Sequence, residues 1–180
     1  KLLASVLTPL PLTVAIFGFF LNRQLKRIEQ LQWANQKLVE KRLEVYSELA
    51  PLLNDLYCYF DYIGQWKWEE PPKAMALKRA IDRLFHVHAH LFSNQFTNAC
   101  YRCIDLYFIP GPLNVYDSSA RMRTDINRRK KLISAQGKQW ESEWDELFSS
   151  PDKITNFPKL LSSYRELMDN FANELGVKNS

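Results

Sequence analysis

Glycine and cysteine are scarce in this chain, and the glycine-rich loops of common enzyme sites are missing. It holds five glycines and three cysteines among 180 residues. It has no Walker loop, no dinucleotide-binding fingerprint and no Gly-x-Ser-x-Gly nucleophile turn. These absences argue against a classical metabolic enzyme. An odd, small number of cysteines also argues against a disulfide scaffold and favours a reducing compartment.

The metal-binding side chains lack a complete motif. Cys100 and Cys103 have the spacing of half a zinc or redox site, but no second cysteine pair follows. His86 and His90 lie one helical turn apart beside Asp82, without a His-Glu-x-x-His motif around them. We therefore expect buried thiols at Cys100 and Cys103. The sequence predicts no metal and no cofactor.

Alternating strand patterns are also scarce, so the fold class that we expect is all-α. Hydrophobic residues make up 46% of the chain and aromatic residues 13%, which is ample for one packed core. Pro-rich and Gly-rich breaks separate helices that we expect over residues 22–50, 73–108, 118–148 and 157–175. Gly176 reads as the stop of the last helix.

The first stretch, Leu2–Leu21, carries no charged residue and has about the ~20 apolar residues of a bilayer-spanning helix. A signal peptide would have a small-residue cleavage site, and a core helix would have a polar face. We therefore predict a single transmembrane helix, continuing into a helical bundle. Pro9 and Pro11 would break or delay the regular helix.

Basic residues after this stretch set the expected orientation. Arg23, Lys26 and Arg27 follow it, against Lys1 alone before it, so the positive-inside rule places the body in the cytoplasm. Trp33 would lie at the lipid headgroups. The predicted location is the bacterial inner membrane, with a single pass, and membrane lipids are expected partners.

The expected span also offers small or polar groups for packing against other copies. These are Thr8, Thr13 and Gly18, with Asn22 at the cytoplasmic end. One uncharged helix cannot form an aqueous path alone, so a pore would need several copies around an axis. We expect a homo-oligomer of more than two copies.

No Gly or Pro interrupts residues 22–50, which predicts one long helix. Two series of apolar residues repeat every seven positions through it, with Asn35 and Arg42 as the polar exceptions. Such a stripe suits a helix that packs on its own domain along one part and on a neighbouring copy along another. The domains we expect are therefore 1–21 (transmembrane), 22–50 (membrane-proximal) and 51–180 (cytosolic).

Arg83 is followed by His88 and His90 at the four-to-six-residue spacing of the HEPN ribonuclease motif. In that family Arg would stabilise charge on the scissile phosphate while His moves a proton of the 2′-hydroxyl. Leu84 stands where the motif has a small polar residue. Three interpretations stay open: a charged outer helix face, a degenerate HEPN-like scaffold, and an active, metal-independent ribonuclease.

A basic run gives the second half of the chain its charge polarity. Residues 121–138 hold seven basic residues and one acid, whereas residues 139–180 hold eight acids and four bases. The run could bind RNA phosphates or anionic lipid heads, or be a solvated helix start. DNA is not an expected partner. Its members are Arg121, Arg123, Arg128, Arg129, Lys130 and Lys131.

The span, the long basic helix, the all-α body and the Arg83–His88 spacing together resemble the small membrane accessory proteins of RNA-targeting CRISPR systems. The resemblance implies a HEPN-like, pore-forming protein that strengthens phage defence, with a CRISPR effector or RNA as partner. Two alternatives are a membrane-tethered HEPN-type ribonuclease and a membrane-anchored scaffold that docks a partner through the basic run. The sequence favours a protein without enzymatic activity.

Overall fold

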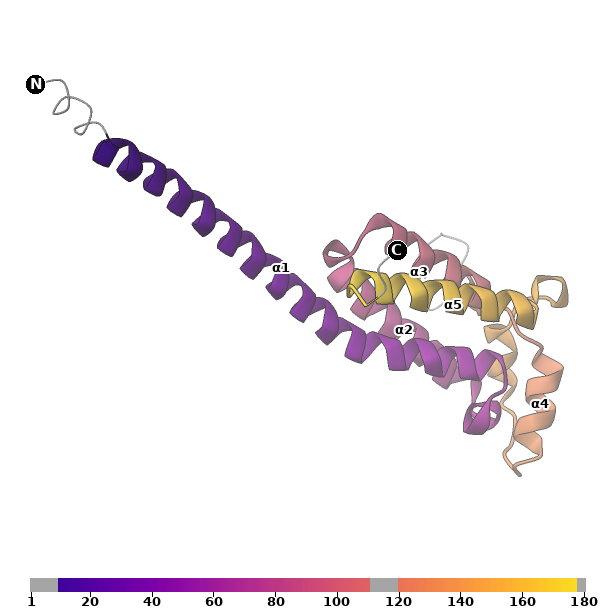
Figure 1. Ribbon diagram of the computed structural model, residues 1–180. Coiled ribbons are helices and arrows are strands. Elements are labelled where there is room, and N and C mark those ends of the chain that lie inside the picture. The colour runs from indigo at the N-terminus through magenta and orange to yellow at the C-terminus, as the bar shows by residue number, and fades with distance from the viewer. Residues whose placement is uncertain (1–9, 111–119, 178–180) are drawn as a thin grey trace, which may run out of the picture. The chain divides into compact units, whose positions relative to one another are not determined.

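The computed structural model describes residues 10–110 and 120–177, and these residues are mostly helical, which confirms the all-α prediction (Figure 1). By contact, the chain divides into two compact units, Lys1–Lys41 and Arg42–Ser180. In chain order the elements are α1 (Leu10–Phe60), η1 (Gly64–Trp68), α2 (Pro71–His88), η2 (Ala89–Leu91), α3 (Asn94–Tyr107), β1 (Phe108–Ile109), β2 (Arg121–Met122), α4 (Ile126–Ser134), η3 (Ser142–Leu147), η4 (Pro151–Lys153) and α5 (Phe157–Glu174), where η marks a 3₁₀ helix.

The predicted transmembrane helix over Leu2–Leu21 is wrong. Across residues 10–110 and 120–177, no helix combines the length and the apolar character that crossing a bilayer requires. Within the described residues, the uncharged part of α1 before the polar pair Asn22 and Arg23 is Leu10–Leu21, which is shorter than the ~20 residues of a bilayer-spanning helix. Of the expected packing residues, Thr8 lies outside the described residues.

The part of α1 from Arg42 onward belongs to the core of the carboxyl-terminal unit. Its apolar residues recur every three or four positions, so they line one face of the helix. Pro51 lies inside this helix and does not end it. The buried residues of this face are Val45, Leu49, Leu53, Leu56, Tyr59 and Phe60.

Helices α2, α3 and α5 supply most of the other residues of that core, together with Phe108 of β1 and Met122 of β2. Figure 1 shows α3 and α5 side by side, and Phe96 of α3 packs on Phe171 of α5 with ring centroids 4.5 Å apart. The predicted helix 73–108 is interrupted by η2, and Ser93 caps the start of α3 by accepting a hydrogen bond from Phe96 N. The last predicted helix is confirmed as α5, and Gly176 follows it with φ +72°.

The predicted helix over 118–148 is wrong. Within its described part, β2 pairs antiparallel with β1, and only α4 and η3 are helical. Asp125 starts α4 by accepting hydrogen bonds from Asn127 N and Arg128 N, and Gly137 adopts φ +71° just beyond its end. Local capping therefore limits this helix to nine residues. Beyond it, Trp140 packs on Trp144.

Candidate functional site

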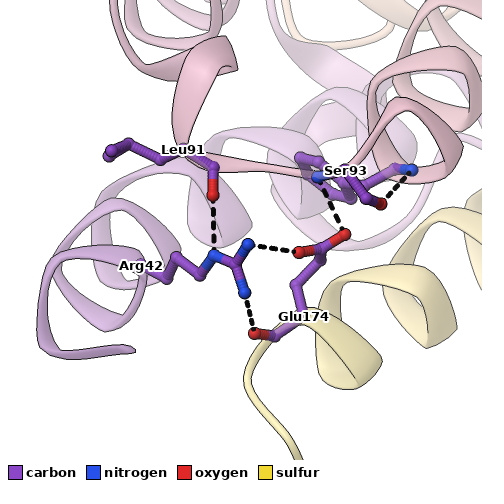
Figure 2. A network of polar contacts seen from close by, with 5 residues as sticks. Arg42, Leu91, Ser93 and Glu174 are labelled. Atoms are coloured by element: carbon purple, nitrogen blue, oxygen red, sulfur yellow. Dashed lines mark hydrogen bonds and ion pairs between the residues drawn. The ribbon is translucent and has the colours of Figure 1, made fainter. Parts of the chain in front are cut away.

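A polar network built on Arg42 joins three elements of the carboxyl-terminal unit (Figure 2). Arg42 Nε donates to Leu91 O at 2.7 Å, and Nη1 donates to Glu174 O at 2.9 Å. Its Nη2 lies 2.9 Å from the Glu174 carboxylate, whose other oxygen accepts a hydrogen bond from Ser93 N at 3.0 Å. The guanidinium lies over the Phe92 ring, 5.7 Å from its centroid. The side chains of Arg42 and Glu174 are 19% and 10% exposed.

The carbonyls that Arg42 binds belong to the last residues of η2 and α5. Carbonyls at a helix end have no partner within the helix and carry the negative end of its dipole, so they favour a cation. The planar guanidinium donates to both carbonyls and to a carboxylate at once, because its N–H groups point in fixed directions. A lysine ammonium group lacks this fixed geometry. The network therefore fixes helix ends in place, and its role is positioning rather than chemistry.

The Arg-His motif lies on α2 and just beyond it. Arg83 is exposed, His88 is the half-buried last residue of α2, and His90 is exposed in η2. Successive residues of an α-helix are rotated by about 100°, so Arg83 and His88 lie about 140° apart around the helix axis. The two side chains are therefore on different faces of α2 within one copy of the chain. Instead Arg83 shares its face with Arg79 and His86, one turn to either side.

The residues that contact Asp82 and His86 on α2 differ from those that the sequence suggested. Asp82 forms an ion pair with the buried Lys78, not with His86. His86 instead lies 6.1 Å, centroid to centroid, from the ring of Tyr101. Over the described residues no cluster of three His, Cys, Asp or Glu side chains could hold a metal ion. The exposed face of α2 thus carries Arg79, Arg83 and His86, and His86 lies beside Tyr101 of α3.

The basic run does not form one basic surface. Arg129 is fully buried, and its guanidinium donates to the carbonyls of Tyr59, Trp66 and Lys67 at 2.6, 3.0 and 3.0 Å. It stacks 3.7 Å from the centroid of the Tyr59 ring, and burial lowers its pKa below the ordinary value of an arginine. Because Tyr59 O lies in the last turn of α1, Arg129 completes that helix end from within the core.

Three further members of the run have partners of their own. Arg123 donates to the carbonyl oxygens of Lys153 and Asp105, at 2.8 and 3.0 Å. Lys130 pairs with Asp145 at 2.8 Å, while Arg128 lies 3.9 Å from the centroid of Tyr62. The other two, Arg121 and Lys131, are exposed. Most of the run therefore holds α4 and β2 in place.

The cysteine prediction is confirmed. Cys100 and Cys103 are buried in the core, and neither forms a disulfide. Burial raises the pKa of Cys100, and it raises the pKa of Cys103 to about 11. Both sulfurs are therefore thiols at neutral pH. This chemistry is that of inert core residues rather than of nucleophiles.

The amino-terminal unit presents a different surface. The apolar side chains of α1 before Arg42 are mostly exposed, from Phe17 at 68% to Ile28 at 49%. Gly18 and Asn22 are exposed too, as are Arg23, Lys26, Arg27 and Trp33. Among them Arg23, Lys26 and Arg27 line one shallow hollow with Phe20, Gln24 and Gln30. The sequence analysis singled out these residues of α1. It did not identify Tyr62, which contacts Arg128, or the partners of Arg42.

No family model, curated protein or solved structure matches this chain.

Proposed function

We propose that the chain is a self-assembling protein, in which the amino-terminal part of α1 joins copies of the molecule. The observation that supports this proposal is the continuous exposure of large apolar side chains over residues 14–33. Soluble monomers rarely leave contiguous apolar surfaces of this kind uncovered. A second copy is the occupant we propose, because the apolar positions follow a heptad repeat.

The repeat can be followed through most of the amino-terminal unit. With Ile28 at position a and Leu31 at position d, six of the eight a and d positions are apolar. Polar pairing occurs away from them: Glu40 accepts hydrogen bonds from Gln36 at 3.0 Å and Lys37 at 2.6 Å, at outer positions. The a and d residues, named the seam from here on, are Val14, Phe17, Leu21, Gln24, Ile28, Leu31, Asn35 and Leu38.

The width of the apolar surface supports more than two copies. A two-stranded coiled coil needs only a narrow a/d stripe, whereas helices of larger bundles are also apolar at e or g. Here five of the eight flanking e and g positions are apolar or glycine. They are Gly18, Phe20, Leu25, Ala34 and Val39. A helix with such a face contacts neighbours on both sides of its seam.

The same assembly would underlie a pore or a membrane-perturbing role in antiviral defence. That role rests on the resemblance to CRISPR accessory proteins alone. A ribonuclease has less support, because Arg83 and His88 lie on different sides of α2. A scaffold that docks a partner through the basic run also has less support, because Arg129 and Arg123 already bind backbone carbonyls.

The test measures the mass of the purified full chain in mild detergent by mass photometry over a range of concentrations. We expect a discrete assembly of more than two copies, and its loss in the variant Ile28→Asp/Leu31→Asp. The matched control Asn22→Asp/Gln30→Asp adds the same charge at outer positions and should keep the assembly.

Three outcomes would contradict the proposal. The first is a monomer of the unmodified chain at every concentration, and the second is equal loss of assembly in both variants. The third is a monomer that binds liposomes, which would identify lipid rather than a second copy as the occupant of the apolar surface.

A further inference from the structure

The two polar residues of the seam are placed asymmetrically along it. Gln24 is the fourth of its eight members and Asn35 is the seventh, and both are exposed. When two copies pack parallel and in register, each seam residue meets its own counterpart, so amide meets amide in both polar layers. Side-chain amides donate and accept hydrogen bonds, so each such layer satisfies itself, and the other six layers are wholly apolar.

An antiparallel second copy that overlaps the whole seam reverses this order. Gln24 then lies opposite Ile28, and Asn35 lies opposite Phe17. Four of the eight layers therefore join an amide to an apolar side chain. An amide that is buried without a hydrogen-bond partner costs free energy, so this arrangement is disfavoured.

Shifting the antiparallel copy by one heptad matches the amides but uncovers apolar residues. The two amides then face each other, whereas Val14 and Phe17 lie opposite positions 45 and 42 of the second copy. Val45 is buried in the core of the carboxyl-terminal unit, and Arg42 is held by the ends of η2 and α5. Neither is available to a second copy, so Val14 and Phe17, which are 66% and 68% exposed, stay uncovered.

The positions beside the seam favour the parallel orientation too. In a parallel pair of helices, each g residue contacts the e residue five positions later in its neighbour. Three such pairs lie along the seam, and each joins residues of one kind, apolar with apolar or polar with polar. They are Phe20 with Leu25, Arg27 with Gln32, and Ala34 with Val39. Because Arg27 meets a neutral amide, these pairs bring no like charges together.

We infer that the copies assemble through parallel helices in register. This inference rests on the proposed self-assembly and adds to it the orientation and register of the second copy. Cyclic symmetry around one axis produces this arrangement directly. The amide layers fix the register, because a slip of one heptad sets Gln24 opposite Leu31 and Asn35 opposite Ile28.

The test measures distances between copies of the full chain in mild detergent, by pulsed electron paramagnetic resonance with one spin label on each chain. The labelled variants are Phe19→Cys, Lys26→Cys and Trp33→Cys, at exposed positions that lie one heptad apart and outside the seam. Each is made in a Cys58→Ser background, because Cys58 is half-buried and the other two native thiols are buried. The background without an introduced cysteine is the control, and it should give no dipolar signal.

Parallel helices in register predict the same distance distribution at all three positions. In the antiparallel arrangement that overlaps the whole seam, Lys26 lies at the centre, so the labels at the other two positions are displaced by about 21 Å along the helix axis. The shifted antiparallel arrangement displaces the labels of Phe19→Cys further still. A longer distance for Phe19→Cys than for Lys26→Cys would therefore overturn the inference and leave self-assembly standing. Absence of a dipolar signal at every position would contradict both.

Discussion

Arg42 and Glu174 form an ion pair across 132 positions of sequence, with Nη2 of Arg42 2.9 Å from the carboxylate. The same guanidinium completes the carbonyl ends of two helices. Arg42→Gln should therefore lower the free energy of unfolding by about 2–3 kcal/mol, because Glu174 is left partly buried without its cation. Chemical denaturation, read by circular dichroism, measures this.

Two comparison variants make that prediction specific. Arg42→Lys keeps the charge but loses the fork geometry, so its loss of stability should be intermediate. Arg79→Gln removes an exposed arginine and should change stability by less than about 0.5 kcal/mol. Equal effects of Arg42→Gln and Arg79→Gln would show that the network contributes nothing.

Local signals in the sequence predicted some elements and not others. Pro71 and Gly176 mark helix ends through their own backbone preferences, so the helix start expected at residue 73 and the helix end expected at residue 175 lie within two residues of the start of α2 and the end of α5. The helix expected over 118–148 failed because apolar spacing does not report the cap at Asp125 or the turn at Gly137. The predicted membrane span is wrong because an uncharged stretch does not by itself provide a helix of sufficient apolar length, and within the described residues only Leu10–Leu21 is uncharged before Arg23.

Contacts between residues far apart in the sequence could not be predicted, because local patterns do not show which distant residues the fold brings together. Arg42 was readable as a polar exception in the repeat, but its partners lie 49 and 132 positions away. Arg129 looked like one more cation in a basic run, and its burial depends on carbonyls more than 60 positions earlier. Composition gives the number of charges, whereas the fold decides which of them face solvent.

Arg129 provides the second prediction. Arg129→Met keeps much of the apolar bulk but leaves the carbonyls of Tyr59, Trp66 and Lys67 without their donor. Buried acceptors without partners and a lost stacking contact should together cost about 3–5 kcal/mol of unfolding free energy. Arg121→Met, at an exposed position of the same run, is the control for denaturant melts. Similar stability in both variants would refute the structural role of Arg129.

The buried thiols predict an alkaline loss of stability. Burial raises the pKa of Cys103 from 9.0 to about 11, so the folded state binds more protons than the unfolded state between these values. The contribution of this thiol to the free energy of unfolding, about 2–3 kcal/mol, is complete below pH 9 and is lost as the pH rises through 11. Cys103→Ala should flatten the fall in unfolding free energy over that range. An unchanged slope would contradict the assignment.

The Arg-His motif gives a prediction about activity. The purified chain should not cleave labelled RNA in the presence of EDTA, because Arg83 and His88 lie about 140° apart around α2. Arg83→Ala/His88→Ala should accordingly remove no cleavage. Cleavage by the unmodified chain that disappears in this variant would instead establish a metal-independent ribonuclease, with the two residues brought together between copies.

Asn35 tests the geometry of the proposed assembly. It occupies an a position of the seam, where a polar residue fixes register and copy number at some cost in stability. Asn35→Ile should therefore produce assemblies that survive greater dilution but no longer have a single mass. Gln36→Ile adds the same side chain at the next, outer position and should leave the mass distribution unchanged. Mass photometry during serial dilution separates these outcomes, and identical behaviour of the two variants would place Asn35 outside the contact between copies.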